Sequence, residues 1–309
     1  MKRHVLVTGG AGFIGSHIAD AFIERGDRVS IIDNLSTGNV RNLNPKAEFH
    51  EADLREERTI ELVRMLRPDV VSHHAAQIDV RHSVADPAID AEINIVATIR
   101  LLQASLDAGV KRFVFASTGG AIYGEPVTAP QDEDHPTHPL SPYGCAKLAV
   151  EHYMHYFREI HGLSTIALRY ANIYGPRQNS KGEAGVIAIF ADRLLSGQEV
   201  TINGDGEQTR DYVFVGDVVR ANVAVTDDLS LKGPFNVGTG VETSVNELYR
   251  SLAAAAGVAR DAQHGPAKAG EQRRSVLDGS KLRRLAGLQE PVALGEGMRE
   301  TVEFFRAAR

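Results

Sequence analysis

The sequence predicts an α/β fold in which a doubly wound parallel sheet, covered by helices on both faces, is followed by a smaller C-terminal α/β lobe. In the first half of the 309-residue chain, short β-branched runs alternate with longer segments whose apolar residues recur at helical spacing. After Pro176 the pattern loosens, and polar loops that contain glycine separate shorter elements. We therefore expect two partly interleaved parts, residues 1–175 and 176–309.

Strands and helices alternate in the first part. The expected strands are 5–8, 29–32, 48–52, 70–72, 112–116 and 165–169. The expected helices are 13–24, 58–66, 93–106 and 142–159. The last two helices are apolar on more than one face, which fits packing against a second copy of the chain or burial within a single chain equally well.

The composition limits the partners and the compartment. Lys and Arg number 34 against 40 Asp and Glu, without a basic block, which argues against nucleic acid or an anionic membrane as the main partner. The single cysteine, Cys145, which we expect to be half-buried, excludes an internal disulfide and suits a reducing cytoplasm. No apolar run has the length of a signal peptide or a membrane span. These observations predict a cytoplasmic protein.

A glycine-rich turn follows the first expected strand. The run "LVTGGAGFIGSH" places Gly9, Gly12 and Gly15 between this strand and the first helix. Gly9 suits the tight turn, Gly12 allows the backbone to approach a pyrophosphate, and Gly15 allows close packing of helix and strand. Such a triplet also occurs in a plain strand-turn-helix, but here the next strand ends in an acid. The turn therefore predicts a Rossmann-type dinucleotide site.

Acidic and small residues follow the next strands. Asp33 can accept hydrogen bonds from ribose hydroxyls and repel a 2′-phosphate, which favours NAD over NADP, although it could also be a loop or N-cap acid. Asp53 is expected near the adenine amino group, and Ala75 and Ala76 are small where the backbone passes the dinucleotide. The neighbouring pair 73–74, both histidines, points to opposite faces of a strand, so we expect no metal site.

The run "SPYGCAKLAVEHY" carries the clearest catalytic signal. Tyr143 and Lys147 are four residues apart near the start of a helix, so their side chains share one face. An ammonium beside a phenol stabilises the phenolate and lowers its pKa, which suits Tyr143 for the role of a general base. An exposed helical pair is the alternative interpretation.

A series of motifs in order carries a family resemblance. They are "TGGAGFIGSH", "DNLSTG", "HHAAQ", "ASTGGAIYGE", "SPYGCAK", "LRYANIYGPRQ" and "GDGEQTRDYVFVGDV". Over nearly its whole length the chain resembles the extended short-chain dehydrogenase/reductase family, the NAD-dependent epimerases and dehydratases, and within it the UDP-glucose 4-epimerases. The resemblance implies NAD, a homodimer formed through a four-helix bundle, and catalysis by Tyr143, Lys147 and Thr118. Ser117 is the alternative hydroxyl, because relatives commonly have one residue fewer before Tyr123, which is expected to pack or to line the sugar pocket.

The resemblance also assigns binding residues. For NAD they are Gly9, Gly12, Phe13, Ile14, Gly15, Asp33, Asn34, Ser36, Gly38, Asp53, Leu54, Ala75, Ala76, Gln77, Asn94, Tyr143, Lys147 and Tyr170. For the substrate they are Thr118, Tyr143, Asn172, Val186, Thr201, Asn203, Arg210, Lys268, Glu271 and Ser275.

Several substrate positions have alternatives. Arg210 is a planar cation suited to a diphosphate, but it could pair with Asp211 or Glu207 at the surface. Asn172 could be a turn residue. Lys268 and Glu271 stand where relatives have Arg and Asp, so a phosphate contact could instead come from the arginines 273–274. The resemblance implies that Ser275 stands where relatives set the room around the sugar C2 group, and because serine is small, we expect N-acetylhexosamines to be accepted as well.

The implied reaction interconverts UDP-glucose and UDP-galactose by reversible oxidation at C4. One alternative is a nucleotide-sugar 4,6-dehydratase or decarboxylase of the same family, but a dehydratase needs an additional acid and base beside the sugar. Relatives of that type carry carboxylates directly after the strand-end hydroxyl, where this chain has Gly119 and Gly120. The second alternative, a catalytically silent NAD-binding sensor, would not need Tyr143 and Lys147.

Overall fold

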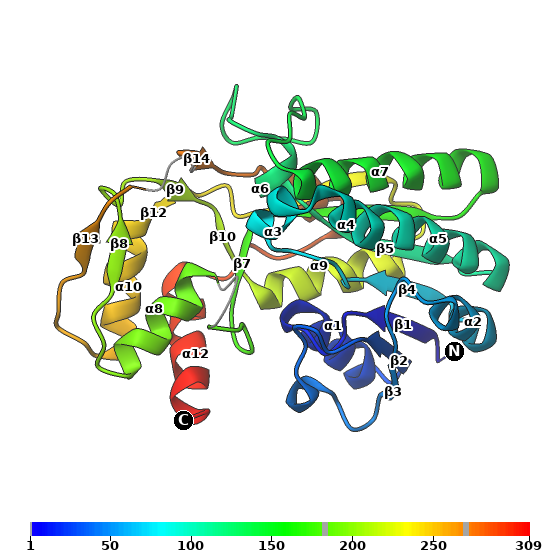
Figure 1. The fold of residues 1–309 in the computed structure, drawn as a ribbon, viewed down its shortest axis with the longest axis horizontal. Helices are drawn as coiled ribbons and strands as arrows, with labels where there is room; N and C mark the ends of the chain where they lie inside the picture. Colours follow the sequence, from blue (N-terminus) through cyan, green and yellow to red (C-terminus); the bar gives the residue numbers. More distant parts are fainter. Residues whose placement is uncertain (1, 181–184, 268–271) are drawn as a thin grey trace.

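The computed structural model describes residues 2–180, 185–267 and 272–309. A seven-stranded parallel sheet with the order β11-β6-β5-β4-β1-β2-β3 forms the centre of the larger part of the molecule, and the C-terminal lobe lies to one side of it (Figure 1). These strands are β1 (His4–Thr8), β2 (Arg28–Asp33), β3 (Glu48–Glu51), β4 (Val70–His73), β5 (Arg112–Thr118), β6 (Thr165–Tyr170) and β11 (Gly233–Val237). Since all of them run parallel, their carboxyl ends lie at one edge.

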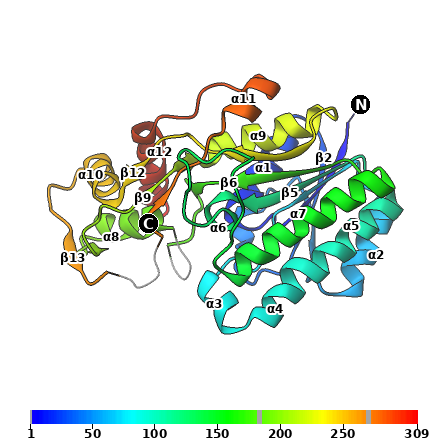
Figure 2. The same ribbon diagram turned by 90° about the horizontal axis from the view of Figure 1, so that it is seen from above.

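Helices cover both faces of the sheet, which confirms the predicted fold class (Figure 2). On one face lie α1 (Phe13–Glu24), α9 (Val215–Asp227) and α11 (Ser280–Ala286). On the other lie α2 (Glu57–Leu66), α5 (Ala97–Ala108) and α7 (Pro142–His161). Apolar residues such as Phe22 of α1 and Leu101 of α5 are fully buried against the sheet. This burial is the main stabilising contribution.

Short elements connect the sheet and the long helices. They are η1 (Val40–Asn42), α3 (Val80–Ala85), α4 (Pro87–Ala91), η2 (Glu92–Val96) and α6 (Gly119–Ile122). The expected helix 93–106 is in fact the π-helical turn η2 continued by α5. Apolar spacing alone cannot distinguish this wide turn from regular helix, and such turns are frequent at functional sites.

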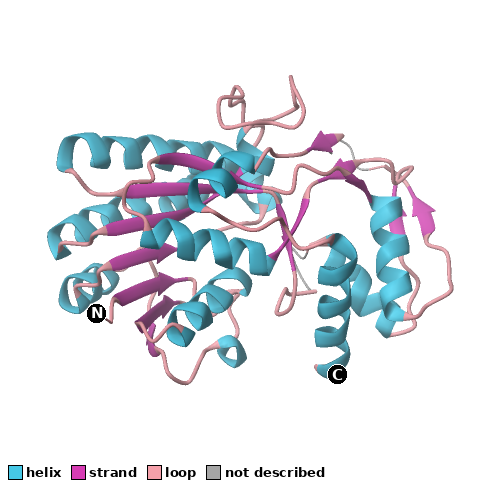
Figure 3. Cartoon of the chain, turned by 180° about the vertical axis from the view of Figure 1, so that it is seen from behind, coloured by secondary structure: helices cyan, strands magenta, loops and turns pink. Residues whose placement is uncertain are grey.

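The C-terminal lobe is built from small sheets of two or three short strands and from helices packed beside them (Figure 3). Its strands are β7 (Asn172–Tyr174), β8 (Thr201–Asn203), β9 (Thr209–Arg210), β10 (Tyr212–Phe214), β12 (Thr243–Ser244), β13 (Gln263–Gly265) and β14 (Arg274–Ser275). Its helices are α8 (Val186–Leu195), α10 (Val245–Ala256) and α12 (Leu294–Ala307), which share an apolar core. The chain crosses back between the two parts, because α9 and β11 belong to the main sheet assembly.

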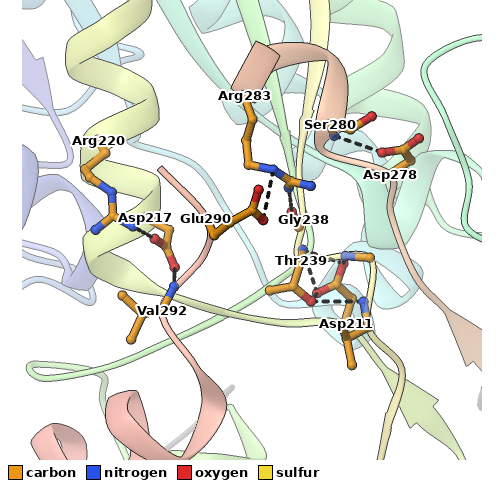
Figure 4. A network of polar contacts seen from close by, with 12 residues as sticks. Asp211, Asp217, Arg220, Gly238, Thr239, Asp278, Ser280, Arg283, Glu290 and Val292 are labelled. Carbon is orange, nitrogen blue, oxygen red and sulfur yellow. Dashed lines mark hydrogen bonds and ion pairs between the residues drawn. The ribbon is translucent and has the colours of Figure 1, made fainter. Parts of the chain in front are cut away.

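A buried polar network joins the lobe to the main sheet (Figure 4). The Asp211 carboxylate accepts hydrogen bonds from the hydroxyl and the N–H of Thr239 and from the N–H groups of Gly240 and Leu277. Asp211 precedes β10, whereas Thr239 follows β11. Because a buried carboxylate is stable only when its oxygens are hydrogen-bonded, these bonds fix the position of the lobe relative to the sheet edge.

Candidate active site

The glycine turn after β1 lies against the loop after β4. Gly9 has a φ of +69°, and a Cβ atom there would stand 2.6 Å from the backbone nitrogen of Ala75. Both observations require glycine. Gly12 is the N-cap of α1 and has no side chain to occupy the N–H groups of the first turn, which includes Phe13 and Ile14. These groups can therefore bind an anion such as a pyrophosphate.

Asp33 holds the glycine turn from the end of β2. Its two carboxylate oxygens accept hydrogen bonds from Ala11 N at 3.0 Å and Leu35 N at 2.8 Å. Each oxygen keeps a lone pair that can accept a ribose hydroxyl. A Cβ on Gly38 would come within 2.9 Å of Asp33 Oδ1, so glycine keeps the space beside this carboxylate open.

Asp53 follows β3 and is linked to the loop after β2. Asn34 Nδ2 donates to Asp53 Oδ2 at 2.8 Å, and Arg55 binds both oxygens of the same carboxylate at 2.9 Å. The bonds from Arg55 hold the pKa of Asp53 far below its usual value, so Asp53 is an anionic acceptor. Beside this group, Ser36 is exposed and Leu54 is buried.

The loop after β4 is fixed by an amide. Asn94 Oδ1 accepts the Gln77 N–H at 3.0 Å, and Asn94 Nδ2 donates to the Gln77 carbonyl at 2.9 Å. Asn94 Nδ2 also donates to Asp90 Oδ1 at 2.9 Å. The buried Asn94 thus orders the loop that carries Ala75 and Ala76.

The two histidines at the end of β4 have separate partners. His73 contacts the hydroxyls of Thr8 and Thr98, whereas His74 contacts that of Ser72. Burial lowers the pKa of His73 and lowers that of His74 to about 3, so both rings are neutral. The described part of the chain holds no group of three or more His, Cys, Asp or Glu side chains arranged for a metal ion.

The two hydroxyl residues at the end of β5 have different surroundings. Ser117 is buried, and its hydroxyl donates to Glu151 Oε1 at 2.5 Å. Thr118 is half-buried, and its hydroxyl makes no hydrogen bond to any residue that the structure describes. Thr118 is therefore the hydroxyl that remains available to a bound molecule.

Tyr143 and Lys147 lie in the first turns of α7. Ser141 caps this helix by accepting the Gly144 N–H at 3.1 Å. A Cβ on Gly144 would overlap the Ala121 carbonyl of α6, so glycine brings the start of α7 close to the end of β5. Lys147 Nζ is 5.7 Å from the centroid of the Tyr143 ring, so the pair shares one face as predicted. Cys145 in the same turn is exposed, so the expected half-burial is wrong.

Burial controls the pKa values of the pair. It raises the pKa of the Tyr143 phenol, and the Asp90 carboxylate adds to the increase. It lowers the pKa of Lys147 to about 8, against opposing effects of Asp90 and Glu151. The prediction of a lowered pKa for the Tyr143 phenol is therefore wrong for the protein without a bound cofactor, because burial raises this pKa.

A buried ion pair that sequence reasoning missed lies behind the catalytic residues. Glu151 Oε2 and Arg169 Nη2 are 2.7 Å apart, and both side chains are less than a tenth exposed. Arg169 Nη1 also donates to the Tyr123 hydroxyl, which donates to Asn236 Oδ1, both at 2.8 Å. Tyr123 therefore packs within this network. Two features of the sequence could have indicated this ion pair. Arg169 is a charged residue inside an otherwise apolar strand, and Glu151 lies four residues after Lys147, on the same face of the helix.

The expected substrate residues are distributed over the lobe and its junction with the sheet. Tyr170 ends β6, Asn172 begins β7, Thr201 and Asn203 bound β8, and Val186 begins α8. Arg210 and the buried Ser275 are register partners in the strand pair β9 and β14. Lys268 and Glu271 lie outside the described residues.

The two arginines considered as substitutes for Lys268 are both engaged in ion pairs. Arg273 binds Asp205 through two nitrogens, and Arg274 binds Glu242 in the same manner.

These features define a class of enzyme. A sheet edge with a phosphate-binding glycine turn lies beside a phenol and an ammonium, and this combination can hold a dinucleotide and move the proton of an alcohol. The chain belongs to the NAD dependent epimerase/dehydratase family, whose model matches residues 5–238.

Named relatives match over nearly the whole chain. A UDP-glucose 4-epimerase of Mycolicibacterium smegmatis is 45% identical over 97% of this chain and 98% of its own. The structure of the Thermotoga maritima UDP-glucose 4-epimerase with UDP-glucose is 48% identical, with a TM-score of 0.95 over 99% of both chains. A Methanobrevibacter ruminantium UDP-N-acetylglucosamine 4-epimerase in complex with UDP-N-acetylmuramic acid is 35% identical, with a TM-score of 0.94 over 100% of both chains. Among the described residues, no helix is long and apolar enough to span a membrane.

Proposed function

We propose that this protein is an NAD-dependent UDP-hexose 4-epimerase that interconverts UDP-glucose and UDP-galactose. The observation that carries the proposal is the pair Tyr143 and Lys147 beside a free strand-end hydroxyl, Thr118, on a dinucleotide-binding sheet edge. Gly119 and Gly120 follow this hydroxyl, so the positions that would hold the carboxylates of a dehydratase have no side chains. The family and the names of its relatives support the same conclusion.

The cofactor site fits NAD. The cradle at Gly9 and the uncapped first turn of α1 accept the pyrophosphate, while Asp33 accepts the adenosine ribose hydroxyls. The anionic Asp53 accepts the adenine amino group. The remaining NAD contacts are assigned to Phe13, Ile14, Asn34, Ser36, Gly38, Leu54, Ala75, Ala76 and Tyr170, with Gln77 and Asn94 ordering the loop. When bound, NAD would supply the hydride acceptor for the oxidation of C4 and the hydride donor for the return step, and the positive charge of its nicotinamide ring would favour a phenolate.

The protein residues bind the sugar oxygen and move its proton. Thr118 hydrogen-bonds O4 of the hexose, and Tyr143 removes the proton from this oxygen as C4 is oxidised. Tyr143 does so as a phenolate, which the positive charges of Lys147 and of bound NAD would favour over the neutral phenol that burial favours in the protein without NAD. Lys147 donates one hydrogen bond to the Ala116 carbonyl at 2.8 Å and retains two N–H groups for the nicotinamide ribose and the phenol. The oxidised sugar turns its other face, and Tyr143 returns the proton to O4. The configuration at C4 inverts without net oxidation.

The UDP group belongs to the lobe in this proposal. Residues 1–175 bind NAD and residues 176–309 bind the nucleotide sugar, with Arg210 on the diphosphate and Thr201 and Asn203 near uracil. Asn172, Val186, Lys268 and Glu271 complete the substrate set. The exposed apolar residues Tyr153, Tyr156 and Ile160 on α7 fit a homodimer interface. The single cysteine fits work in the cytoplasm.

An assay with UDP-galactose and NAD tests the function. We expect UDP-glucose as the product, detected by a coupled dehydrogenase. A 4-keto-6-deoxy product would instead identify a dehydratase, and no product with any UDP, dTDP or GDP sugar would favour a sensor. Either result would overturn the proposal.

The small side chain of Ser275 predicts that UDP-N-acetylhexosamines are also substrates. Ser275→Tyr is expected to lower kcat/KM for the N-acetylated pair by about tenfold or more, because a bulky ring competes with the acetamido group. UDP-glucose turnover of the same variant is the internal control and should fall much less. If the wild-type protein converts only the non-acetylated pair, this assignment of Ser275 is wrong.

A further inference from the structure

Asp90 is a buried carboxylate to which the proposed reaction gives no role. It lies in α4 and is 1% exposed. Oδ1 accepts hydrogen bonds from Gln77 Nε2 and Asn94 Nδ2, both at 2.9 Å. Oδ2 is also buried and has no hydrogen-bond partner among the residues that the structure describes. Burying a carboxylate oxygen without a donor is costly, so a nearby positive charge is needed to offset the cost.

That positive charge is on α7. Both α4 and η2 pack against α7, which carries Tyr143 and Lys147 in its first turns (Figure 2). The Asp90 charge acts on both side chains, because it raises the pKa of Lys147 and also that of Tyr143. Asp90 opposes the effect of burial on the pKa of Lys147 more strongly than Glu151 does. Asp90 therefore lies on a helix that packs against α7, close enough for its charge to act on both side chains of the pair.

The other groups of α7 do not replace Asp90. Tyr143 is neutral while its pKa is raised, and its ring centroid is 5.7 Å from Lys147 Nζ. Glu151 is negative, but it is engaged by Arg169 at 2.7 Å and by the Ser117 hydroxyl. Asp90 is thus the carboxylate without a cationic partner of its own in this part of the described structure.

The strands on the other side of Lys147 contribute no negative charge. From β4, His73 and His74 are neutral, and the Lys147 ammonium itself helps to lower their pKa values. From β5, the Phe115 ring lies 4.6 Å from Nζ and the Ala116 carbonyl accepts one hydrogen bond. These two contacts carry no net negative charge and only partly offset the cost of burying the Lys147 ammonium. The ammonium therefore depends on the negative charge of Asp90 in α4 to remain protonated.

We propose that Asp90 is a positioning residue that supplies the counter-charge of the buried Lys147 ammonium and orders the dinucleotide loop through Asn94. The second role follows because Asp90 fixes the orientation of the Asn94 amide, which bonds both backbone groups of Gln77. This inference rests on the proposed function for its catalytic meaning. The electrostatic coupling itself can be measured without turnover.

The test compares Asp90→Asn with the matched control Glu92→Gln. Glu92 lies two residues later, at the start of η2, and is exposed, so its variant removes the same charge at a position in contact with water. The rate of Lys147 acetylation by acetic anhydride, followed against pH by mass spectrometry, gives the titration midpoint of this lysine. We expect the midpoint to fall by about one pH unit or more in Asp90→Asn and to be unchanged in Glu92→Gln. Asp90→Glu, which keeps the charge, should keep the midpoint close to the wild-type value.

The pH dependence of kcat with UDP-galactose gives a second readout. Loss of the carboxylate lowers the pKa of both Tyr143 and Lys147, so the acidic and alkaline limbs should both move to lower pH. A role in packing alone would reduce kcat evenly and leave the limbs and the Lys147 midpoint in place, which would overturn the proposal. An unchanged midpoint in a folded Asp90→Asn protein, or the same shift in Asp90→Glu, would also overturn it. A shifted midpoint in a protein without epimerase activity would support the coupling and reject the proposed function.

Discussion

Tyr143→Phe is expected to lower the rate of epimerisation by about 10²–10⁴-fold, because the variant has no group that can take the proton from O4. The fold should change little, since the Tyr143 hydroxyl makes no hydrogen bond to the described residues and only its oxygen is removed. The free energy of unfolding should stay within about 1 kcal/mol of the wild-type value. Single-turnover kinetics and urea unfolding measure the two effects.

Tyr123→Phe is the matched control for this variant. It makes the same chemical change in a buried tyrosine whose hydroxyl bonds Arg169 and Asn236. We expect it to cost about 1–3 kcal/mol of stability, because two buried polar groups lose a partner, and to retain most activity at a temperature where it is folded. If Tyr143→Phe keeps substantial activity, or if both variants lose it equally, Tyr143 is not the base.

Arg169→Met is expected to destabilise the protein by about 3–5 kcal/mol. The substitution leaves the Glu151 carboxylate buried without its cation, and removal of one partner of a buried pair is costly in this range. The Tyr123 hydroxyl loses a donor at the same time. The midpoint and slope of urea unfolding measure the change.

Two further variants distinguish the loss of the buried ion pair from a nonspecific loss of stability. Glu151→Leu combined with Arg169→Met replaces both charges by apolar groups, and it should recover a large part of the loss. Arg273→Met breaks the exposed pair with Asp205, and little measurable change is expected because water screens this pair. A loss below about 1 kcal/mol in Arg169→Met would show that the buried pair is not a stabilising requirement.

Local spacing was sufficient to predict the geometry of the glycine turn and of the helical pair, whereas their roles in cofactor binding stay predictions. The glycine turn, Asp33 and the Tyr143 and Lys147 pair depend on residues close in sequence, where turn and helix geometry apply directly. The alternation of strand and helix patterns in the sequence was enough to predict a parallel sheet with helices on both of its faces. The strand β11 was missed, because its pairing with β6 joins segments that are far apart in the chain.

Contacts between residues far apart in the sequence decided the points that local sequence patterns could not decide. Ser117 and Thr118 are equivalent in sequence, but Glu151 from α7 engages one hydroxyl and leaves the other available. Asp90 resembles any helical acid until burial places it against α7. The direction of the Tyr143 pKa shift was missed for a related reason, since burial depends on the whole fold and not on the distance to Lys147.

The π-helical turn η2 makes the position of Asp90 relative to α7 depend on the number of residues in the segment Glu92–Val96. Regular α-helix turns by about 100° per residue, so deletion of one residue within Glu92–Val96 would rotate the preceding helix α4 about the axis of α5. Asp90 would then leave the face that meets α7. During divergence of such proteins, this segment should therefore tolerate exchange of exposed side chains more readily than insertion or deletion.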